Sequence, residues 1–470
     1  MMENALQRCG SVLQNKKNKR EGEEEKEDDR ISELPDDILA RIVSGLPLKE
    51  AVATSVLAKR WRYIWTFTKN LDFDAEETLN RIIESPGQLL RVERPKYIDR
   101  VNSVIAQRSS KNNMVRGIDR FRIGFDLCRE FSSSIDNWIE FAMKNRVKTL
   151  ELEFFEYGGL RMNCDCYILR KKHFDPVALK SLKVLNLTSV EIHGRVVEWL
   201  LSKCPLLERL KVAGSDKLIN LRISGVPNLK HFEIRRCINI KKVEICAAQN
   251  LVSLYSLSTY PYEFILRNVP KLVDLHIDTD FGSDNDEDLG LTFTLLSSCL
   301  SQLQILHLDL LLQPHVWNLE YPRLTNLKHL KLTLSATENL NLLLSRIIPF
   351  LKVSPCLQRL ELMMLLEKYF DEKCGFVKQP TNCPVKEVEI LGYSGRKNLD
   401  QLIIYFADNL VALQKIVVHP CASAHEKFNF DPAFRRIKNS KIIKEEEKIR
   451  DHAMQHIKGK IPTAVEFVCL

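Results

Sequence analysis

A short unit, apolar-x-x-apolar-x-apolar, recurs along most of this chain and limits the folds that it can adopt. It stands as "VKTLEL" at 147, "LKVLNL" at 182, "LERLKV" at 207, "LKHLKL" at 327 and "LQRLEL" at 357. The last three positions alternate between apolar and polar residues, which predicts a short strand with one buried face. A single unit cannot bury that face alone, so we expect neighbouring units to stack on one another.

The middle apolar residue of each unit marks the period of the repeat. In order, these marker residues are Phe121, Leu150, Leu185, Leu210, Phe232, Leu254, Leu275, Leu306, Leu330, Leu360, Val388 and Ile416. Most steps between them lie near the period of about 20 to 29 residues that is typical of leucine-rich repeats. We therefore predict an α/β fold, built as a solenoid of leucine-rich repeats.

Secondary units, "LINLRI" at 218 and "IKKVEI" at 240, lie halfway between markers. They predict a second parallel sheet on the outer side of the coils in that segment. Longer steps leave room for an outer helix, as in "GRVVEWLLSKCP" at 194–205. A doubly wound sheet of unrelated strand–helix units is the alternative, but no glycine-rich phosphate loop follows any strand.

Charge and cysteine content limit the function classes. The 470 residues carry a net charge of +8, from 69 basic and 61 acidic residues, which is too diffuse to predict a nucleic-acid partner. No apolar run reaches the length of about 18 residues needed to span a membrane, and no secretory h-region is found near the start. The 13 cysteines show no paired CxxC spacing, so we expect free thiols, and a location in the nucleus, the cytoplasm or both.

The N-terminal 70 residues differ from the repeats. Residues 1–29 are polar and charged, which predicts a disordered tail. In the following stretch, Ile38, Leu39, Ile42, Val43 and Leu46 recur at helical spacing, with Ser32 as a candidate cap. Trp61, Ile64 and Trp65 share one face of a further helix. About 35 residues cannot stabilise a core alone, so we expect these helices to lean on a partner chain or on the next domain.

The same stretch, "ISELPDDILARIVSGLPLKEAVATSVLAKRWRYIW" at 31–65, resembles the F-box of plant F-box proteins in its LPDD, GLP, TSVL and KRWRxxW motifs. Residues 383–420, with "GYSGR" and a later "LQKIVV", resemble the FBD domain. The chain is thus similar to the plant F-box/leucine-rich-repeat/FBD family. The resemblance implies an F-box helical bundle at 30–70, a helical linker at 71–115, a solenoid at 116–380 and an FBD cap at 381–440. Residues 441–470 form an extension of open role.

The resemblance also implies a function. An F-box docks onto the Skp-type adaptor of an SCF-type ubiquitin ligase, which contains a cullin and a RING protein, and the repeats bind a target protein. Such a substrate receptor is not an enzyme and uses no cofactor. Two other hypotheses stay open: a non-degradative scaffold, and a receptor whose target binding is gated by a small molecule.

Apolar side chains that the short bundle cannot bury are predicted to contact the adaptor. They are Leu34, Pro35, Ile38, Leu39, Leu46, Pro47, Val56, Leu57 and Trp61. Trp61 and Trp65 are also expected to divide between the internal F-box core and the linker. Internal packing is the alternative for any single one of these residues.

Target binding is predicted on the concave sheet, where residues between the buried positions point outward. The candidates are Arg209, Lys211, His231, Glu233, His276, His307, Lys331 and Arg359, although each histidine could be an ordinary exposed polar residue. Cys164, Cys166 and His173 lack a fourth ligand for zinc, and the acidic run at 278–290 fails the spacing of a calcium loop. No metal site is predicted.

Overall fold

The structure, a computed structural model, describes residues 31, 33–75, 77–79, 86–109, 117–154, 165–257, 263–278, 293–294, 296–310, 320–335, 340–365, 383–421 and 440–470. The chain divides into two compact units, Met1–Ser189 and Val190–Leu470. The predicted tail at 1–29 and the predicted cap Ser32 lie outside the described residues. No helix in the described ranges is both long and apolar enough to cross a membrane.

The first unit begins with short helices separated by prolines. They are α2 (Asp36–Ser44), α3 (Leu48–Ala53), η1 (Thr54–Val56) and η2 (Trp61–Phe67). Pro35 and Pro47 stand immediately before α2 and α3 with an extended backbone, which suits a residue without an N–H group at the start of a helix. Trp61, Ile64 and Trp65 are all buried, as their shared face predicts. A salt bridge of 2.7 Å joins Arg60 Nη2 to Asp36 Oδ1 and ties the chain before η2 to α2.

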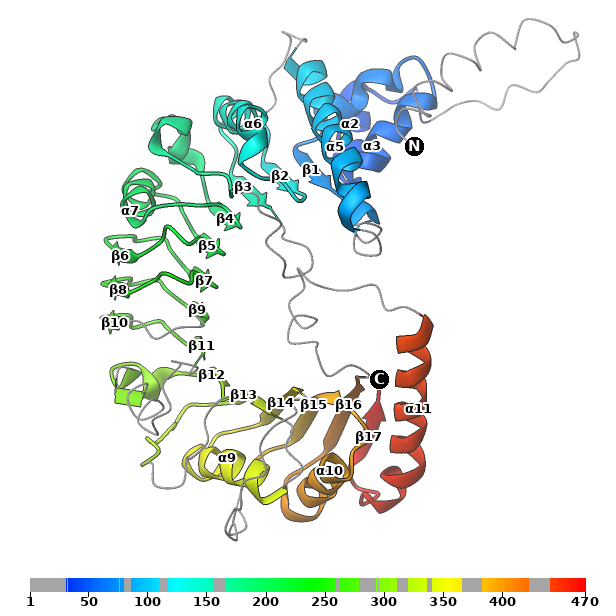
Figure 1. Ribbon diagram of the computed structural model, residues 1–470, viewed down its shortest axis with the longest axis vertical. Helices are drawn as coiled ribbons and strands as arrows, with labels where there is room; N and C mark the ends of the chain where they lie inside the picture. The colour runs from blue at the N-terminus through cyan, green and yellow to red at the C-terminus, as the bar shows by residue number, and fades with distance from the viewer. Residues whose placement is uncertain are drawn as a thin grey trace, which may run out of the picture. The chain divides into compact units, whose positions relative to one another are not determined.

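The rest of the first unit is a parallel sheet with helical connections (Figure 1). Its elements are β1 (Asn70–Asp74), α5 (Pro86–Ser109), β2 (Arg120–Gly124), η3 (Arg129–Phe131), α6 (Ser132–Lys144), β3 (Thr149–Glu153), η4 (Lys171–His173), η5 (Ala178–Ser181) and β4 (Val184–Thr188), with strand order β1-β2-β3-β4. The linker predicted to be helical contains α5, but it also contains most of β1, which the sequence analysis did not anticipate. Tyr97 of α5 donates its O–H to the Phe73 carbonyl of β1 at 2.6 Å.

The second unit continues the same construction with ten parallel strands. In spatial order they are β5 (Arg209–Ala213), β7 (His231–Arg235), β9 (Ser253–Leu257), β11 (Asp274–Asp278), β12 (Ile305–Asp309), β13 (His329–Ser335), β14 (Arg359–Leu365), β15 (Glu387–Tyr393), β16 (Lys415–Pro420) and β17 (Glu466–Cys469). The helical segments are α7 (Gly194–Lys203), η6 (Leu300–Gln302), α9 (Leu340–Val353), α10 (Lys397–Asn409), α11 (Ser440–His456) and η8 (Lys458–Lys460).

The repeat prediction is confirmed residue by residue. Every marker residue occupies the second position of a strand, and each is at most 2% exposed. Side-chain amides also link successive coils: Asn228 donates to the Pro205 carbonyl at 2.7 Å, and Asn250 donates to the Pro227 carbonyl at 2.6 Å. These bonds satisfy carbonyl groups of the turns, which a stacked coil would otherwise leave without a partner.

The predicted second sheet is also confirmed. It contains β6 (Asn220–Ser224) and β8 (Lys242–Cys246), which the secondary units at 218 and 240 predicted, and a third strand, β10 (Glu263–Arg267). No repeat unit in the sequence predicted β10. The outer helix predicted at 194–205 is α7, whose Gly194 lies so close to the Asn220 carbonyl that an added Cβ would come within 1.8 Å.

The C-terminal extension, whose role was open, completes the sheet. Strand β17 pairs in parallel with β16, and α11 packs against both strands. Tyr393, in the "GYSGR" segment, donates to Asp400 Oδ1 at 2.5 Å, and His452 of α11 lies 2.9 Å from Asp400 Oδ2. Gly392 has a φ of +80°, and a Cβ there would come within 2.2 Å of the Met364 carbonyl oxygen, so glycine is required.

Candidate functional site

The F-box helices expose apolar side chains instead of burying all of them. Ile38 is 39% exposed, Ile42 45%, Val56 56% and Leu57 65%. Leu34 and Leu46 are half-buried, and Pro35 and Pro47 are exposed. These eight residues of the first unit, named here the F-box face, include seven of the nine residues predicted to contact the adaptor.

The apolar residues of helix α2 form two neighbouring stripes, one buried and one exposed. Leu39 and Val43, four residues apart, are fully buried, whereas Ile38 and Ile42 lie one position earlier on an exposed stripe. Full burial of an isoleucine returns about 1.5–3 kcal/mol, and the exposed part of Ile38 and Ile42 forgoes a share of that transfer free energy in the free chain. A partner surface that covers these isoleucines would recover part of that transfer free energy.

The structure removes two predicted residues from this face. Leu39 (0% exposed) and Trp61 (4% exposed) lie in the core of the F-box helices, so they support the bundle and are not presented to a partner. Ile42 takes their place on the F-box face. The helical spacing of the sequence placed Ile42 on the apolar stripe, but it did not say which edge of the stripe stays exposed.

The predicted target-binding residues lie on the polar face of the sheet in the second unit. Seven residues follow one another at the third position of seven paired strands and form what we name the central row: Lys211, Glu233, Tyr255, His276, His307, Lys331 and Glu361. Arg209, His231 and Arg359 stand two positions earlier, in a neighbouring row. The strand register therefore brings all eight predicted residues to one face.

The middle of the central row is a stack of rings. The Tyr255 and His276 ring centroids are 3.8 Å apart, and those of His276 and His307 are 3.5 Å apart. The Arg235 guanidinium lies over Tyr255 at 3.8 Å, a cation–π contact. His307 Nε2 lies 3.0 Å from the Thr333 hydroxyl oxygen. Tyr255 was missed from the sequence because "LVSLYSL" at 251–257 is the least regular repeat unit. Arg235 was missed because it stands after the last apolar position of the unit at 229–234.

Both stacked histidines are held neutral. Burial, then the nearby His307, Arg235 and Lys331, lower the pKa of His276 well below its usual value. Burial lowers the pKa of His307 to about 3, and the Lys331 ammonium adds to the effect. Since the two rings almost touch, a proton on either one would meet positive charge on several sides. At neutral pH the stack is therefore an uncharged surface within a charged face.

Ion pairs flank the ring stack on both sides. On one side, Glu233 Oε1 forms ion pairs with Arg235 Nε, at 2.5 Å, and with Lys211 Nζ, at 3.5 Å. On the other side, Glu361 accepts from Lys331 at 2.9 Å and lies 3.3 Å from His329. Burial opposes ionisation of Glu361, but hydrogen bonds from His329 and Lys331 prevail and lower its pKa to about 2.

The remaining predicted residues are placed near these pairs. Arg359 pairs with Glu389, which also accepts from His419 at 2.7 Å. His231 Nδ1 lies 2.7 Å from the Ser253 hydroxyl, and burial lowers its pKa. Arg209 is exposed at the start of β5. Most of the polar face is thus already paired within the chain.

The sequence candidates for metal binding do not gather into a described cluster. Cys164 lies outside the described residues, and His173 is occupied by Tyr167, at 3.4 Å, and by Asp136, at 3.3 Å. Most of the acidic run at 278–290 also lies outside them. Six of the ten described cysteines are buried, and burial raises the pKa of Cys204, Cys237 and Cys299 to about 12, which keeps them as thiols.

Comparison with known proteins assigns two domains, the second of which begins within the first unit. Residues 31–72 match the F-box domain, and residues 111–470 match the leucine-rich-repeat domain described as At1g61320/AtMIF1. The second match runs through the segment predicted as an FBD cap and on to the last residue, so a separate FBD domain at 381–440 is not confirmed.

Similar proteins from Arabidopsis thaliana agree with these assignments. The F-box/LRR-repeat protein At3g59200 is 27% identical over 446 residues, which cover 83% of this chain and 82% of that protein. The putative F-box protein At3g58860 is 26% identical, over 83% of this chain and 88% of its own length. The F-box/FBD/LRR-repeat protein At1g13570 is 29% identical, over 56% of this chain and 58% of its own length. With its F-box helices followed by a buried leucine ladder, the chain belongs to the F-box/leucine-rich-repeat family.

Proposed function

We propose that this protein is the substrate-recognition subunit of an SCF-type ubiquitin ligase. The F-box face docks a Skp-type adaptor, through which a cullin and a RING protein are recruited, and the polar face of the second unit binds a target protein. The chain performs no bond chemistry in this role and needs no cofactor. It acts by holding the target near the ubiquitin-charged enzyme, which raises the local concentration of target lysines.

The observation that carries the proposal is the exposure of Ile38, Ile42, Val56 and Leu57 on helices of a domain that matches the F-box. Four large apolar side chains held in water by one small bundle are the centre of a protein interface, which excludes water around an apolar core. A free-standing bundle gains nothing from this arrangement.

The test is capture of a Skp-type adaptor and a cullin by the full chain. Ile38→Asp combined with Leu57→Asp is expected to lower capture of both at least a hundredfold, since each change places a charge in the apolar contact. Val411→Asp is the matched control, because Val411 is 93% exposed but lies in the second unit. Val411→Asp is expected to capture both partners like the wild type.

Two outcomes would favour the alternative functions. If the wild type captures the adaptor but no cullin, the non-degradative scaffold becomes the better description. If target binding appears only after a small molecule is added, the polar face is a gated receptor. The nucleus and the cytoplasm remain the proposed locations, and imaging of the tagged chain tests them.

We also propose that the described part of the predicted FBD segment, residues 383–421, closes the solenoid as a cap together with residues 440–470 of the extension. The strands β15, β16 and β17 continue the parallel ladder, and the helices α10 and α11 contribute to the cap. Terminal repeats need such a unit because their last apolar face would otherwise stay exposed.

A further inference from the structure

Most carboxylates on the polar face of the second unit are paired within the chain, but that of Asp274 is not. Glu233, Glu361 and Glu389 each lie against an arginine or a lysine of the same face. Asp274, at the first position of β11, is half-buried on that face. Within the part of the chain that the structure describes, no hydrogen bond or ion pair is found for its carboxylate. Asp274 therefore keeps its capacity to accept hydrogen bonds from a partner.

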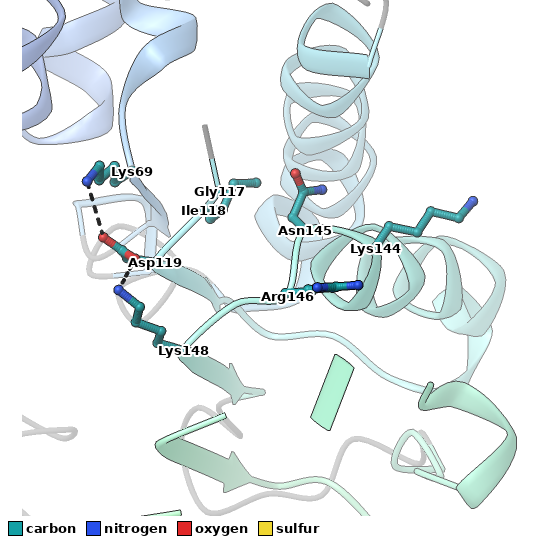
Figure 2. A pocket seen from close by; sticks show the side chains of 8 residues that line it. All are labelled: Lys69, Gly117, Ile118, Asp119, Lys144, Asn145, Arg146 and Lys148. Carbon is teal, nitrogen blue, oxygen red and sulfur yellow. Dashed lines mark ion pairs between the residues drawn. The ribbon is translucent and has the colours of Figure 1, made fainter. Parts of the chain in front are cut away.

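A carboxylate in the first unit shows the more usual arrangement. At a hollow of about 720 Å³, the Asp119 carboxylate lies between two lysine side chains (Figure 2). Lys148 Nζ is 2.8 Å from it and Lys69 Nζ is 4.0 Å from it. The two lysines stand beside Asp119 just before β1, β2 and β3, so the strand register supplies the cations.

The register around Asp274 supplies no cation at the paired positions. Asp274 pairs with Ser253 of β9 and with Ile305 of β12. The Ser253 hydroxyl lies 2.7 Å from His231 Nδ1, and the Ile305 side chain has no polar atom. His276 follows two positions later on β11, so it lies on the same face as Asp274. The unpaired carboxylate thus stands next to the ring stack.

The cationic groups further along the face are engaged by another carboxylate. Burial raises the pKa of Asp274, and Lys331 and His329 act in the opposite direction. The Lys331 ammonium, however, lies 2.9 Å from Glu361, and His329 Nε2 lies 3.3 Å from the same carboxylate. Asp274 has therefore lost part of its hydration without gaining an ion pair in return. A cation brought by a partner would compensate for that loss.

We infer that Asp274 binds an arginine side chain of the target protein, an inference that rests on the proposed receptor role. A guanidinium presents its N–H groups as a planar fork and can donate two parallel hydrogen bonds to one carboxylate. It is more weakly hydrated than an ammonium, which suits a half-buried site. Ile305 offers an apolar contact for the aliphatic stem of the arginine.

The ring stack beside Asp274 favours the same occupant. Because His276 and His307 are neutral, they do not repel an incoming cation. A neutral imidazole also keeps one nitrogen that can accept an N–H. An acidic target residue would instead have to compete with Glu361 for Lys331. The described residues therefore favour a basic target segment over an acidic one.

The experiment measures binding of three fluorescent peptides to the full chain. They consist of three glycine–arginine, three glycine–lysine or three glycine–glutamate pairs. The lysine peptide carries the same charge as the arginine peptide, so it reports general attraction of cations. The arginine peptide is expected to bind at least fivefold more tightly than the lysine peptide and at least tenfold more tightly than the glutamate peptide. Equal binding of the arginine and lysine peptides would overturn the inference.

The variants locate the site. Asp274→Asn keeps the size of the side chain but removes its charge, and it is expected to weaken binding of the arginine peptide at least tenfold. Glu263→Gln removes one exposed negative charge from the outer sheet and is expected to bind the peptide like the wild type. Asp274→Glu retains the charge and is expected to keep most of the binding, which separates loss of charge from a change of fold. Unchanged binding by Asp274→Asn would overturn the inference.

Adaptor capture by the same variants separates the inference from the proposed receptor role. Asp274 lies in the second unit and the F-box face lies in the first, so Asp274→Asn is expected to capture the adaptor like the wild type. If the wild type fails to capture the adaptor, the receptor role fails, whereas binding of the arginine peptide is still measured directly. If capture succeeds and peptide binding does not depend on Asp274, only the arginine site fails.

Discussion

The F-box face and the central row of the second unit differ in how their side chains are exposed or paired in the free chain. The F-box face leaves Ile38, Ile42, Val56 and Leu57 in water, so it gains apolar burial only when a partner covers it. The central row instead pairs its side chains within the chain, through the ring stack and the Glu233 and Glu361 ion pairs. An interface of the first kind suits one constant partner, and a preordered polar face suits discrimination between many.

The largest expected effect compares neighbouring residues on β11. Leu275 is fully buried, and Leu275→Ala is expected to lower the free energy of unfolding of the second unit by about 2–5 kcal/mol. His276→Ala changes the opposite face and should cost much less, because no core cavity is created. Denaturant titration of the two variants checks this, and equal losses would show that the ring stack is part of the core.

The next effect separates core from contact in the F-box. Leu39→Ala is expected to destabilise the F-box helices by about 2–3 kcal/mol, since a small bundle can partly collapse around the lost volume. Ile38→Ala should change stability by about 0.5 kcal/mol or less but weaken adaptor binding about tenfold. Thermal unfolding and adaptor titration measure the two properties. A stability loss from Ile38→Ala as large as that from Leu39→Ala would remove the distinction between the two stripes.

A smaller effect concerns pH. The folded-state pKa of His307 lies at about 3, below that of an unfolded histidine at about 6.5, so the unfolded chain binds more protons between these values. Stability therefore falls as the pH drops from about 6.5 towards 3. Between pH 7 and 5.5, His307→Asn is expected to lose about 1 kcal/mol less than the wild type. This window lies above the range from about 4.5 to 2, in which the stabilising contribution of the Glu361 carboxylate is lost. Identical pH profiles would contradict a neutral stack.

The smallest effect concerns the cation–π contact. A double-mutant cycle of Arg235→Met and Tyr255→Leu is expected to give a coupling free energy of about 0.5–1 kcal/mol. The single variant Lys211→Met, combined with Tyr255→Leu, serves as the control cycle and should give a smaller coupling. A coupling near zero in both cycles would mean that Arg235 is placed by Glu233 alone.

The sequence by itself determined the repeat, the buried positions within each unit and the apolar residues of the F-box. Each marker residue is buried in the structure because alternation with period two leaves a strand one way to hide its leucines. The same local pattern predicted the outer sheet of β6 and β8. It missed β10, whose segment lacks the full repeat unit, and β17, which follows a helix in the extension of open role.

The tertiary structure decided which side chains meet and which stay exposed. Tyr255, His276 and His307 touch because coils of different length place them at the same register of neighbouring strands. No local sequence pattern encodes this alignment. Leu39 and Ile38 are neighbours of similar hydrophobicity, and only the packing of η2 against α2 decides which is buried. Burial and charge proximity are properties of the stacked chain, so the sequence supplies the side chains and the fold supplies their neighbours.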